Sequence, residues 1–72
     1  MAKTYADYSL YEKIRDAKGL TDYSVAQKAE VATATMTNWK QGVYAPKIDK
    51  IIKIASVLDV PIESLLTTTE EQ

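Results

Sequence analysis

Apolar residues recur at intervals of three and four in the second half of the sequence, a spacing that places them on one face of an α-helix. The repeat contains Ile48, Ile51, Ile52, Ala55 and Leu58 and is the most regular amphipathic pattern in the chain. A helix with such a face must be covered by other elements. The repeat therefore predicts a helix that packs inside a globular domain.

Composition limits what this domain can contain. The chain has 72 residues, which is enough for one domain but leaves little room for an internal cavity. It has no cysteine and no histidine, so disulfides, thiolate nucleophiles, imidazole bases and the usual zinc ligands are excluded. An enzyme, a cofactor, a metal site and a small-molecule ligand are not expected. Because no membrane span or signal peptide is recognisable, we expect a cytoplasmic protein that does not contact a membrane.

Turn and cap signals divide the first part of the chain into short helices. Ser9 and Glu12 have the spacing of a capping box and predict a helix over residues 10–18. Gly19 is placed to adopt the left-handed conformation that closes this helix. Thr21 can then cap a second helix, which lasts for about two turns.

Three further signals complete the expected order of elements. A brief break at residues 30–32 is followed by a third helix over residues 33–41, which Gly42 ends. The amphipathic helix comes next. Pro61 then starts a last short helix, whose apolar residues are Ile62, Leu65 and Leu66.

These segments predict an all-α fold, a compact five-helix bundle. Residues 1–8 have no helical period and are expected to form an N-terminal arm. The folded domain is expected over residues 9–66. The polar residues 67–72 are expected to be a flexible C-terminal tail.

Two neighbouring helices have the arrangement of a helix-turn-helix unit, in which a two-turn helix, a three-residue break and a second short helix follow one another. Ala26 is small enough to let these helices cross closely, and we expect Val31 and Met36 to fill the corner between them. Trp39 is expected to face the core. The charge distribution permits a nucleic-acid partner but does not require one, since residues 28–53 carry a net charge of +3 and residues 59–72 carry −4, and lysines are also common on solvated helix surfaces.

The sequence resembles the Cro/cI-type repressor family, also called the XRE family, most clearly in the stretch LTDYSVAQKAEVATATMTNWKQGVYAPKIDKIIKIASVLDV. The resemblance covers residues 9–66. The residues that stand in register with the family's pattern are Leu20, Thr21, Val25, Ala26, Val31, Met36, Trp39, Gly42, Pro46, Ile51, Ile54, Ala55, Leu58 and Val60. This resemblance implies a lambda-repressor-like fold that binds double-stranded DNA.

The resemblance also implies which side chains touch DNA. The base-reading positions fall on the start and outer face of the third helix, at Thr33, Ala34, Thr37 and Asn38. Among them, Asn38 suits adenine because its amide offers a donor and an acceptor side by side. Phosphate contacts are expected at Thr21, Tyr23, Lys40, Gln41, Tyr44 and Lys47. Without the surrounding motif, the same polar residues would be interpreted as an ordinary solvated helix face.

Three residues depart from the family's pattern. Asp22 stands where many members have a glutamine that contacts DNA, and we expect its carboxylate to complement the dipole of the second helix instead. Glu30 replaces the usual turn glycine and must accept a positive φ. Lys40 replaces a glutamate that pairs with the arginine matching Arg15, which leaves Arg15 in need of another partner. The candidates for Arg15 are Asp49, Glu12 and solvent.

The function implied is a sequence-specific transcriptional regulator, expected to be a repressor from a phage or mobile element. A homodimer on DNA is expected because one module of this size buries too little surface to bind tightly and selectively. The expected dimer contacts are Val60, Ile62, Leu65 and Leu66, although Leu65 can equally close the core. The alternative is a protein-interaction module such as an antitoxin or adaptor, which the acidic tail slightly favours.

Overall fold

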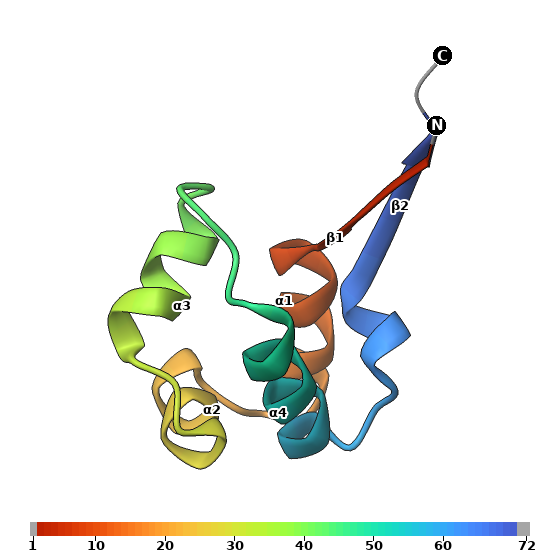
Figure 1. Ribbon diagram of the computed structural model, residues 1–72. Helices are drawn as coiled ribbons and strands as arrows, with labels where there is room; N and C mark the ends of the chain where they lie inside the picture. Colours follow the sequence, from red (N-terminus) through yellow and green to blue (C-terminus); the bar gives the residue numbers. More distant parts are fainter. Residues whose placement is uncertain (1, 71–72) are drawn as a thin grey trace.

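Residues 2–70 are described by a computed structural model, and this part of the chain contains four α-helices, one 3-10 helix and a two-stranded sheet (Figure 1). In chain order the elements are β1 (Ala2–Ala6), α1 (Tyr8–Ala17), α2 (Asp22–Ala29), α3 (Thr33–Lys40), α4 (Ile48–Leu58), η1 (Ile62–Leu65) and β2 (Leu66–Glu70). None of these helices is long and apolar enough to cross a membrane. The helical class is confirmed, but the expected fifth α-helix is instead a 3-10 helix of four residues.

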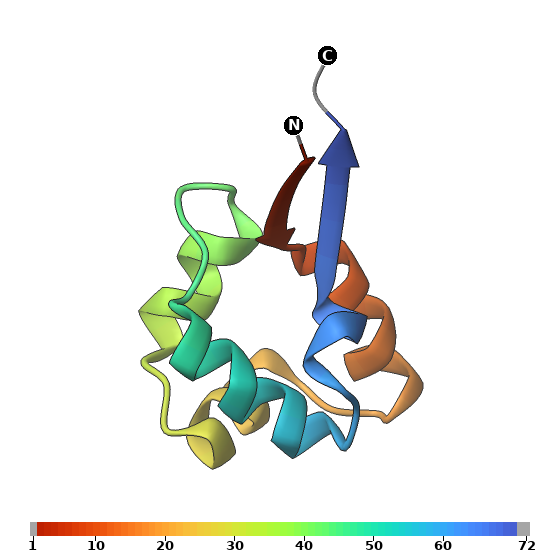
Figure 2. The same ribbon diagram turned by 45° about the vertical axis from the view of Figure 1, so that its right-hand side comes forward.

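The two ends of the chain pair as an antiparallel sheet that stands out from the helices (Figures 1 and 2). In its register Thr4 lies opposite Thr68, and the two hydroxyl oxygens are 3.0 Å apart. The predicted arm over residues 1–8 and flexible tail over residues 67–72 are therefore corrected, since residues 2–6 and 66–70 are strands and Tyr8 is already helical. Threonine favours extended chain and pairs well across strands. Residues 1, 71 and 72 lie outside the described residues.

Asp7 caps α1, so the predicted cap at Ser9 is wrong by two residues. The Asp7 carboxylate accepts hydrogen bonds from the Ser9 backbone N–H at 2.9 Å and from the Thr67 hydroxyl at 2.8 Å. The Asp7 backbone N–H also donates to the Leu65 carbonyl oxygen at 2.8 Å. Asp7 therefore joins the start of α1 to the start of β2, and this contact between the chain ends makes it a better cap than Ser9.

The predicted turn residues adopt the expected conformations. Thr21 caps α2 by accepting from the Ser24 backbone N–H at 3.1 Å. Glu30 takes the left-handed conformation with φ of 58°, as expected. Asp59, for which no such conformation was predicted, does the same after α4 with φ of 56°. Gly42 ends α3 with φ of 77°. These turns set the directions in which α3 and α4 leave the preceding helices.

Only part of the apolar repeat on α4 is buried. Ile51, Ala55 and Leu58 lie in the core, but Ile48 and Ile52 are 60% and 54% exposed. Ile54 completes the buried face instead, because it lies three residues from Ile51 and four from Leu58. The helix packs mainly against α2 and η1, so the buried face of α4 is turned toward Ile54 and away from the two exposed isoleucines.

An aromatic cluster joins α1 to α3. Trp39 is 4% exposed, which confirms that it faces the core. Its ring lies 5.4 Å from the ring of Tyr8 in an edge-on arrangement and 5.0 Å from that of Tyr11. The indole N–H donates to the Ala6 carbonyl oxygen at 3.4 Å. Trp39 therefore holds the inner face of α3 against both α1 and the end of β1.

Candidate nucleic-acid interface

The α2–α3 corner has the close packing that the sequence predicts. Ala26 is fully buried and Met36 nearly so, and Val31 is buried between them in the turn. The Val31 backbone N–H donates to the Ala26 carbonyl oxygen at 2.9 Å, which closes the end of α2 after the left-handed Glu30. The three-residue break at residues 30–32 then leads directly into α3. Two short helices are thus held at a fixed angle around a small buried residue.

The outer face of α3 carries the four residues predicted to contact bases. Figure 2 places α3 and α1 on opposite sides of the bundle, so the face of α3 that turns away from α1 is available. Thr33, Ala34 and Thr37 are exposed there, and Asn38 is half-buried. The Thr37 hydroxyl donates to the Thr33 carbonyl oxygen at 3.2 Å. The predicted positions therefore share one face of one helix, as base reading requires.

All six residues predicted to contact phosphate are exposed and lie around that face. They come from the start of α2, the end of α3 and the loop that follows, and they are Thr21, Tyr23, Lys40, Gln41, Tyr44 and Lys47. The α3 helix has no side-chain cap at its N-terminus, so its first backbone N–H groups can donate to an anion. Donors thus surround the predicted base-reading positions.

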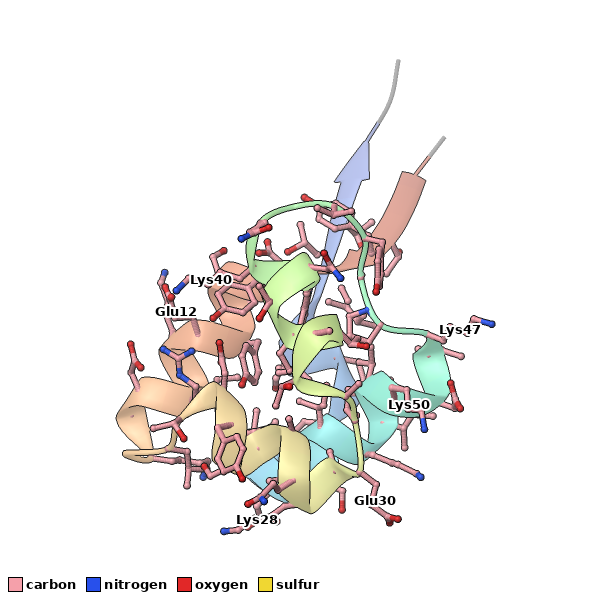
Figure 3. All side chains as sticks on the ribbon, turned by 90° about the vertical axis from the view of Figure 1, so that its left-hand side faces the viewer. Glu12, Lys28, Glu30, Lys40, Lys47 and Lys50 are labelled. Carbon is pink, nitrogen blue, oxygen red and sulfur yellow. The ribbon has the colours of Figure 1, made fainter. Side chains whose placement is uncertain are left out.

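Positive side chains lie on both sides of α3. In Figure 3, where α3 is at the front, Lys40 lies on one side of it and Lys47 and Lys50 lie on the other. Lys28 lies at the α2 end, close to Glu30, and Glu12 lies near Lys40. The chain has a formal net charge of −1, but residues 28–53, which contain α3 and these lysines, carry a net charge of +3. Such local positive charge attracts a polyanion even when the net charge is negative.

A groove between α2 and α3 brings residues of both helices together. Its volume is about 310 Å³, and it is lined by Asp22, Tyr23, Thr33, Met36 and Thr37. Predicted phosphate and base contacts therefore meet in one concave strip of the surface. The carboxylate of Asp22 is the one acidic group among these lining residues, and its contacts decide whether it repels a phosphate.

Asp22 is held inside a hydrogen-bond network that the sequence did not reveal. Its carboxylate oxygens accept from the Tyr8 hydroxyl at 2.8 Å, from the Tyr11 hydroxyl at 2.8 Å and from Arg15 Nη1 at 2.6 Å. Burial raises the pKa of Asp22, but the hydrogen bonds from Arg15, Tyr11 and Tyr8 outweigh it and hold the pKa below its ordinary value. The carboxylate is thus ionised and is held by Arg15 and the two tyrosine hydroxyls.

Of the expected partners of Arg15, which are Asp49, Glu12 and solvent, Glu12 lies within ion-pair distance, but the shortest contact is with Asp22. Arg15 Nη2 also lies 2.7 Å from Asp16 and 3.9 Å from Glu12. The signal that could have found this network is the spacing of Tyr8, Tyr11 and Arg15, which places three donors on one face of α1. An acidic residue just after the next helix cap is the natural acceptor for such a face.

The dimer residues predicted near the C-terminus have different exposures. Leu65 is fully buried, so it closes the core, which is the other role considered for it. Val60 and Ile62 are partly buried and pack against the core, and Leu66 is half-buried at the start of β2. Leu65 therefore has no surface to offer to a second chain.

The packed α2–turn–α3 corner with an exposed outer face on α3 defines a helix-turn-helix domain. In agreement, the helix-turn-helix family model matches residues 12–65. The chain belongs to this family and is of the XRE type.

Several solved structures are similar to this fold, among them the following two. One is the restriction-modification controller protein C.AhdI from Aeromonas hydrophila, with 23% identity and a TM-score of 0.71, over 78% of this chain and 85% of that one. The other is the N-terminal DNA binding domain of SinR from Bacillus subtilis, with 28% identity and a TM-score of 0.70, over 76% of this chain and 81% of that one. No curated protein sequence matches the chain.

Proposed function

We propose that this protein is a transcriptional regulator that binds double-stranded DNA at a specific sequence, with α3 in the major groove. The observation that carries the proposal is the exposed face of Thr33, Thr37 and Asn38 on a helix whose opposite side is anchored in the core by Trp39. An α-helix fits the width of the major groove, and these side chains have the donors, acceptors and methyl groups that base edges recognise. The similar N-terminal domain of SinR is a DNA binding domain, which supports the same function.

In this complex the residues around α3 set its position on the DNA. Thr21 and Tyr23 at the start of α2 contact phosphate on one side, while Lys40, Gln41, Tyr44 and Lys47 contact it on the other. Thr33, Ala34, Thr37 and Asn38 read the bases. Because the Asp22 carboxylate already accepts hydrogen bonds from Arg15, Tyr8 and Tyr11, the groove between α2 and α3 does not present a free carboxylate to phosphate.

The regulator acts as a homodimer, and its source is a phage or other mobile element. Val60, Ile62 and Leu66 supply the contact between copies, because each keeps part of its apolar surface outside the core. A dimer places two α3 helices about 34 Å apart, one turn of DNA. Two modules on a partly palindromic site supply the buried surface that one small domain lacks.

The salt dependence of DNA affinity tests this function. If each subunit neutralises about five phosphates, the logarithm of the affinity constant falls with the logarithm of salt concentration at a slope of about −4 to −5 per subunit. Lys40→Glu is expected to weaken binding to all sequences and to lower the magnitude of this slope by about 1 per subunit. The measurement is fluorescence anisotropy with duplexes selected from a random pool, at several salt concentrations.

Lys13→Glu is the matched control for this experiment. It makes the same change in net charge on an exposed position of α1, across the bundle from α3, so the slope should stay near that of the parent protein. An equal effect of both substitutions would show that only overall charge matters. Unchanged affinity after Lys40→Glu would show that Lys40 does not contact DNA.

A protein-interaction module remains the second candidate, because an apolar surface is exposed outside the proposed DNA interface. Ile48 and Ile52 lie one turn apart on α4 and are 60% and 54% exposed. Such residues suit a protein partner. Failure of the protein to shift any duplex at low salt would favour this function over DNA binding.

A further inference from the structure

One of the predicted base-reading side chains is already held by a neighbour in the free protein. Asn38 Nδ2 donates a hydrogen bond to the Tyr44 hydroxyl oxygen at 3.0 Å. The two residues come from different segments, since Asn38 lies in α3 and Tyr44 in the loop that follows. The contact therefore depends on how the chain leaves α3.

The end of α3 is built so that Tyr44 returns along the helix toward Asn38. Gly42 adopts φ of 77°, and the Val43 backbone N–H donates to the Asn38 carbonyl oxygen at 2.9 Å. This is the closure of a helix by a left-handed glycine. It places the residue after Val43 beside the turn that contains Asn38, and the backbone and side chain of Asn38 are thus both bonded to the same short loop.

The hydrogen bond selects one orientation of the Asn38 amide. In the structure the amide nitrogen faces Tyr44. A flipped amide would have to accept the hydroxyl proton, and Tyr44 could then no longer donate that proton to a phosphate. With one N–H donated to Tyr44, the second N–H and the carbonyl oxygen remain for a partner. That pair of groups matches the N7 acceptor and N6 donor of adenine.

Tyr44 also keeps a free donor. Its hydroxyl oxygen accepts from Asn38 and its proton can be donated elsewhere, and the side chain is 52% exposed at a position predicted to contact phosphate. A hydroxyl that donates to a charged phosphate oxygen becomes a better acceptor for the Asn38 N–H. Contact with a DNA phosphate and base reading by Asn38 are therefore linked through the hydroxyl oxygen of Tyr44.

We propose that Tyr44 is a positioning residue for base recognition: it fixes the amide of Asn38 so that this residue reads adenine, and it couples that reading to the adjacent phosphate. This inference rests on the proposed function. It goes beyond a phosphate contact by Tyr44, because it assigns to Tyr44 an effect on sequence preference.

Tyr44→Phe tests the inference because it keeps the ring and removes only the oxygen. Affinity is measured for the selected site and for a site changed at the base pair that Asn38 reads. The ratio of these two affinities is expected to be about fivefold smaller for Tyr44→Phe than for the parent protein. Asn38→Ala removes the same preference, and Tyr44→Phe in that background is expected to change the preference no further. Tyr23→Phe is the matched control.

The Tyr23 hydroxyl makes the same kind of hydrogen bond as the Tyr44 hydroxyl. The Tyr23 hydroxyl accepts from Gln27 Nε2 at 2.9 Å, so it has the same kind of amide partner, but Gln27 lies on α2 and not at a predicted base-reading position. Tyr23→Phe is expected to weaken binding equally at both sites. A uniform loss after Tyr44→Phe, like that of the control, would overturn the inference and leave the proposed function intact.

A measurement on the free protein tests the role of Tyr44 separately from DNA binding. The side-chain amide signals of Asn38 in a nitrogen–proton NMR spectrum, identified by their loss in Asn38→Ala, are expected to shift in Tyr44→Phe and to stay in place in Tyr23→Phe. Unchanged Asn38 signals in Tyr44→Phe would overturn the inference without reference to DNA. Absence of any sequence preference in the parent protein would overturn the proposed function and the inference together.

Discussion

Trp39→Ala is expected to destabilise the fold by about 3–5 kcal/mol, the cost of removing a large buried aromatic side chain. Trp39 is 4% exposed, and its ring lies 5.4 Å and 5.0 Å from the rings of Tyr8 and Tyr11. The substitution leaves a cavity between α1 and α3 and removes the donor to the Ala6 carbonyl oxygen. For a domain this small, such a loss is a large part of the total stability.

Urea unfolding followed by far-ultraviolet circular dichroism measures this loss. Tryptophan fluorescence cannot follow the unfolding of these variants, because Trp39 is the single tryptophan of the chain. Trp39→Phe is the companion variant, since it keeps an aromatic ring in the cluster and is expected to lose less than Trp39→Ala. An unchanged unfolding midpoint for Trp39→Ala would contradict the placement of this side chain in the core.

Asp22→Ala is expected to cost about 2–3 kcal/mol. The substitution leaves the Tyr8 and Tyr11 hydroxyls without their acceptor and leaves Arg15, whose side chain is 14% exposed, without its 2.6 Å partner. Breaking a fully buried ion pair costs about 3–5 kcal/mol, and the expected value is lower because the Asp22 side chain is 29% exposed. Thermal and urea unfolding of the parent and variant give the difference.

Asp16→Ala is the matched control, because Asp16 is paired with the same arginine. Its carboxylate lies 2.7 Å from Arg15 Nη2, but its side chain is 65% exposed. An exposed pair of this kind contributes up to about 1 kcal/mol. An equal loss of stability in Asp16→Ala and Asp22→Ala would show that the stabilisation depends only on pairing the charge of Arg15. It would contradict a special contribution from the partly buried Asp22 carboxylate.

The contribution of Asp22 also depends on pH in a defined direction. Since the folded protein holds the pKa of Asp22 below its ordinary value, the stabilisation is fully present above the unfolded-state pKa of about 3.9. It is lost as the pH falls through the folded-state pKa. The difference in stability between parent and Asp22→Ala is therefore expected to be constant near neutral pH and to shrink below about pH 4.

Local signals predicted the helices well. Periodic apolar residues, the Thr21 cap and the glycines at the helix ends act within a few residues of one another. The spacing of two short helices and the small Ala26 predicted the α2–α3 corner, and the family resemblance then indicated the left-handed Glu30 and the outer face of α3. Those features depend on neighbours in sequence, and sequence patterns report such neighbours directly.

Long-range pairings were not visible in the same way. Thr4 and Thr68 lie opposite each other in the sheet although 64 positions separate them, and neither strand has apolar alternation that would mark it. The cap of α1 shifted to Asp7 because Thr67, from the other chain end, also donates to its carboxylate. The Asp22 network likewise joins α1 to α2 through side chains whose partners depend on the packed fold.

The α4 helix shows why a regular repeat does not identify the buried face by itself. Ile48 and Ile52 fit the period as well as Ile51 does, yet they are exposed. Burial is decided by the elements that cover the helix, which are mainly α2 and η1. The period predicted the helix and the family resemblance included Ile54, but only the packing shows that Ile54 is buried while Ile48 and Ile52 are exposed.

Titration of isotope-labelled protein with its selected DNA duplex, followed by NMR of the backbone amides, shows which elements contact DNA. If α3 lies in the major groove, the largest shift changes fall on residues 33–38, with smaller changes at residues 21–23 and 40–47. Changes concentrated on α1 or on the β1–β2 sheet, with the α3 amides unmoved, would contradict this placement of α3.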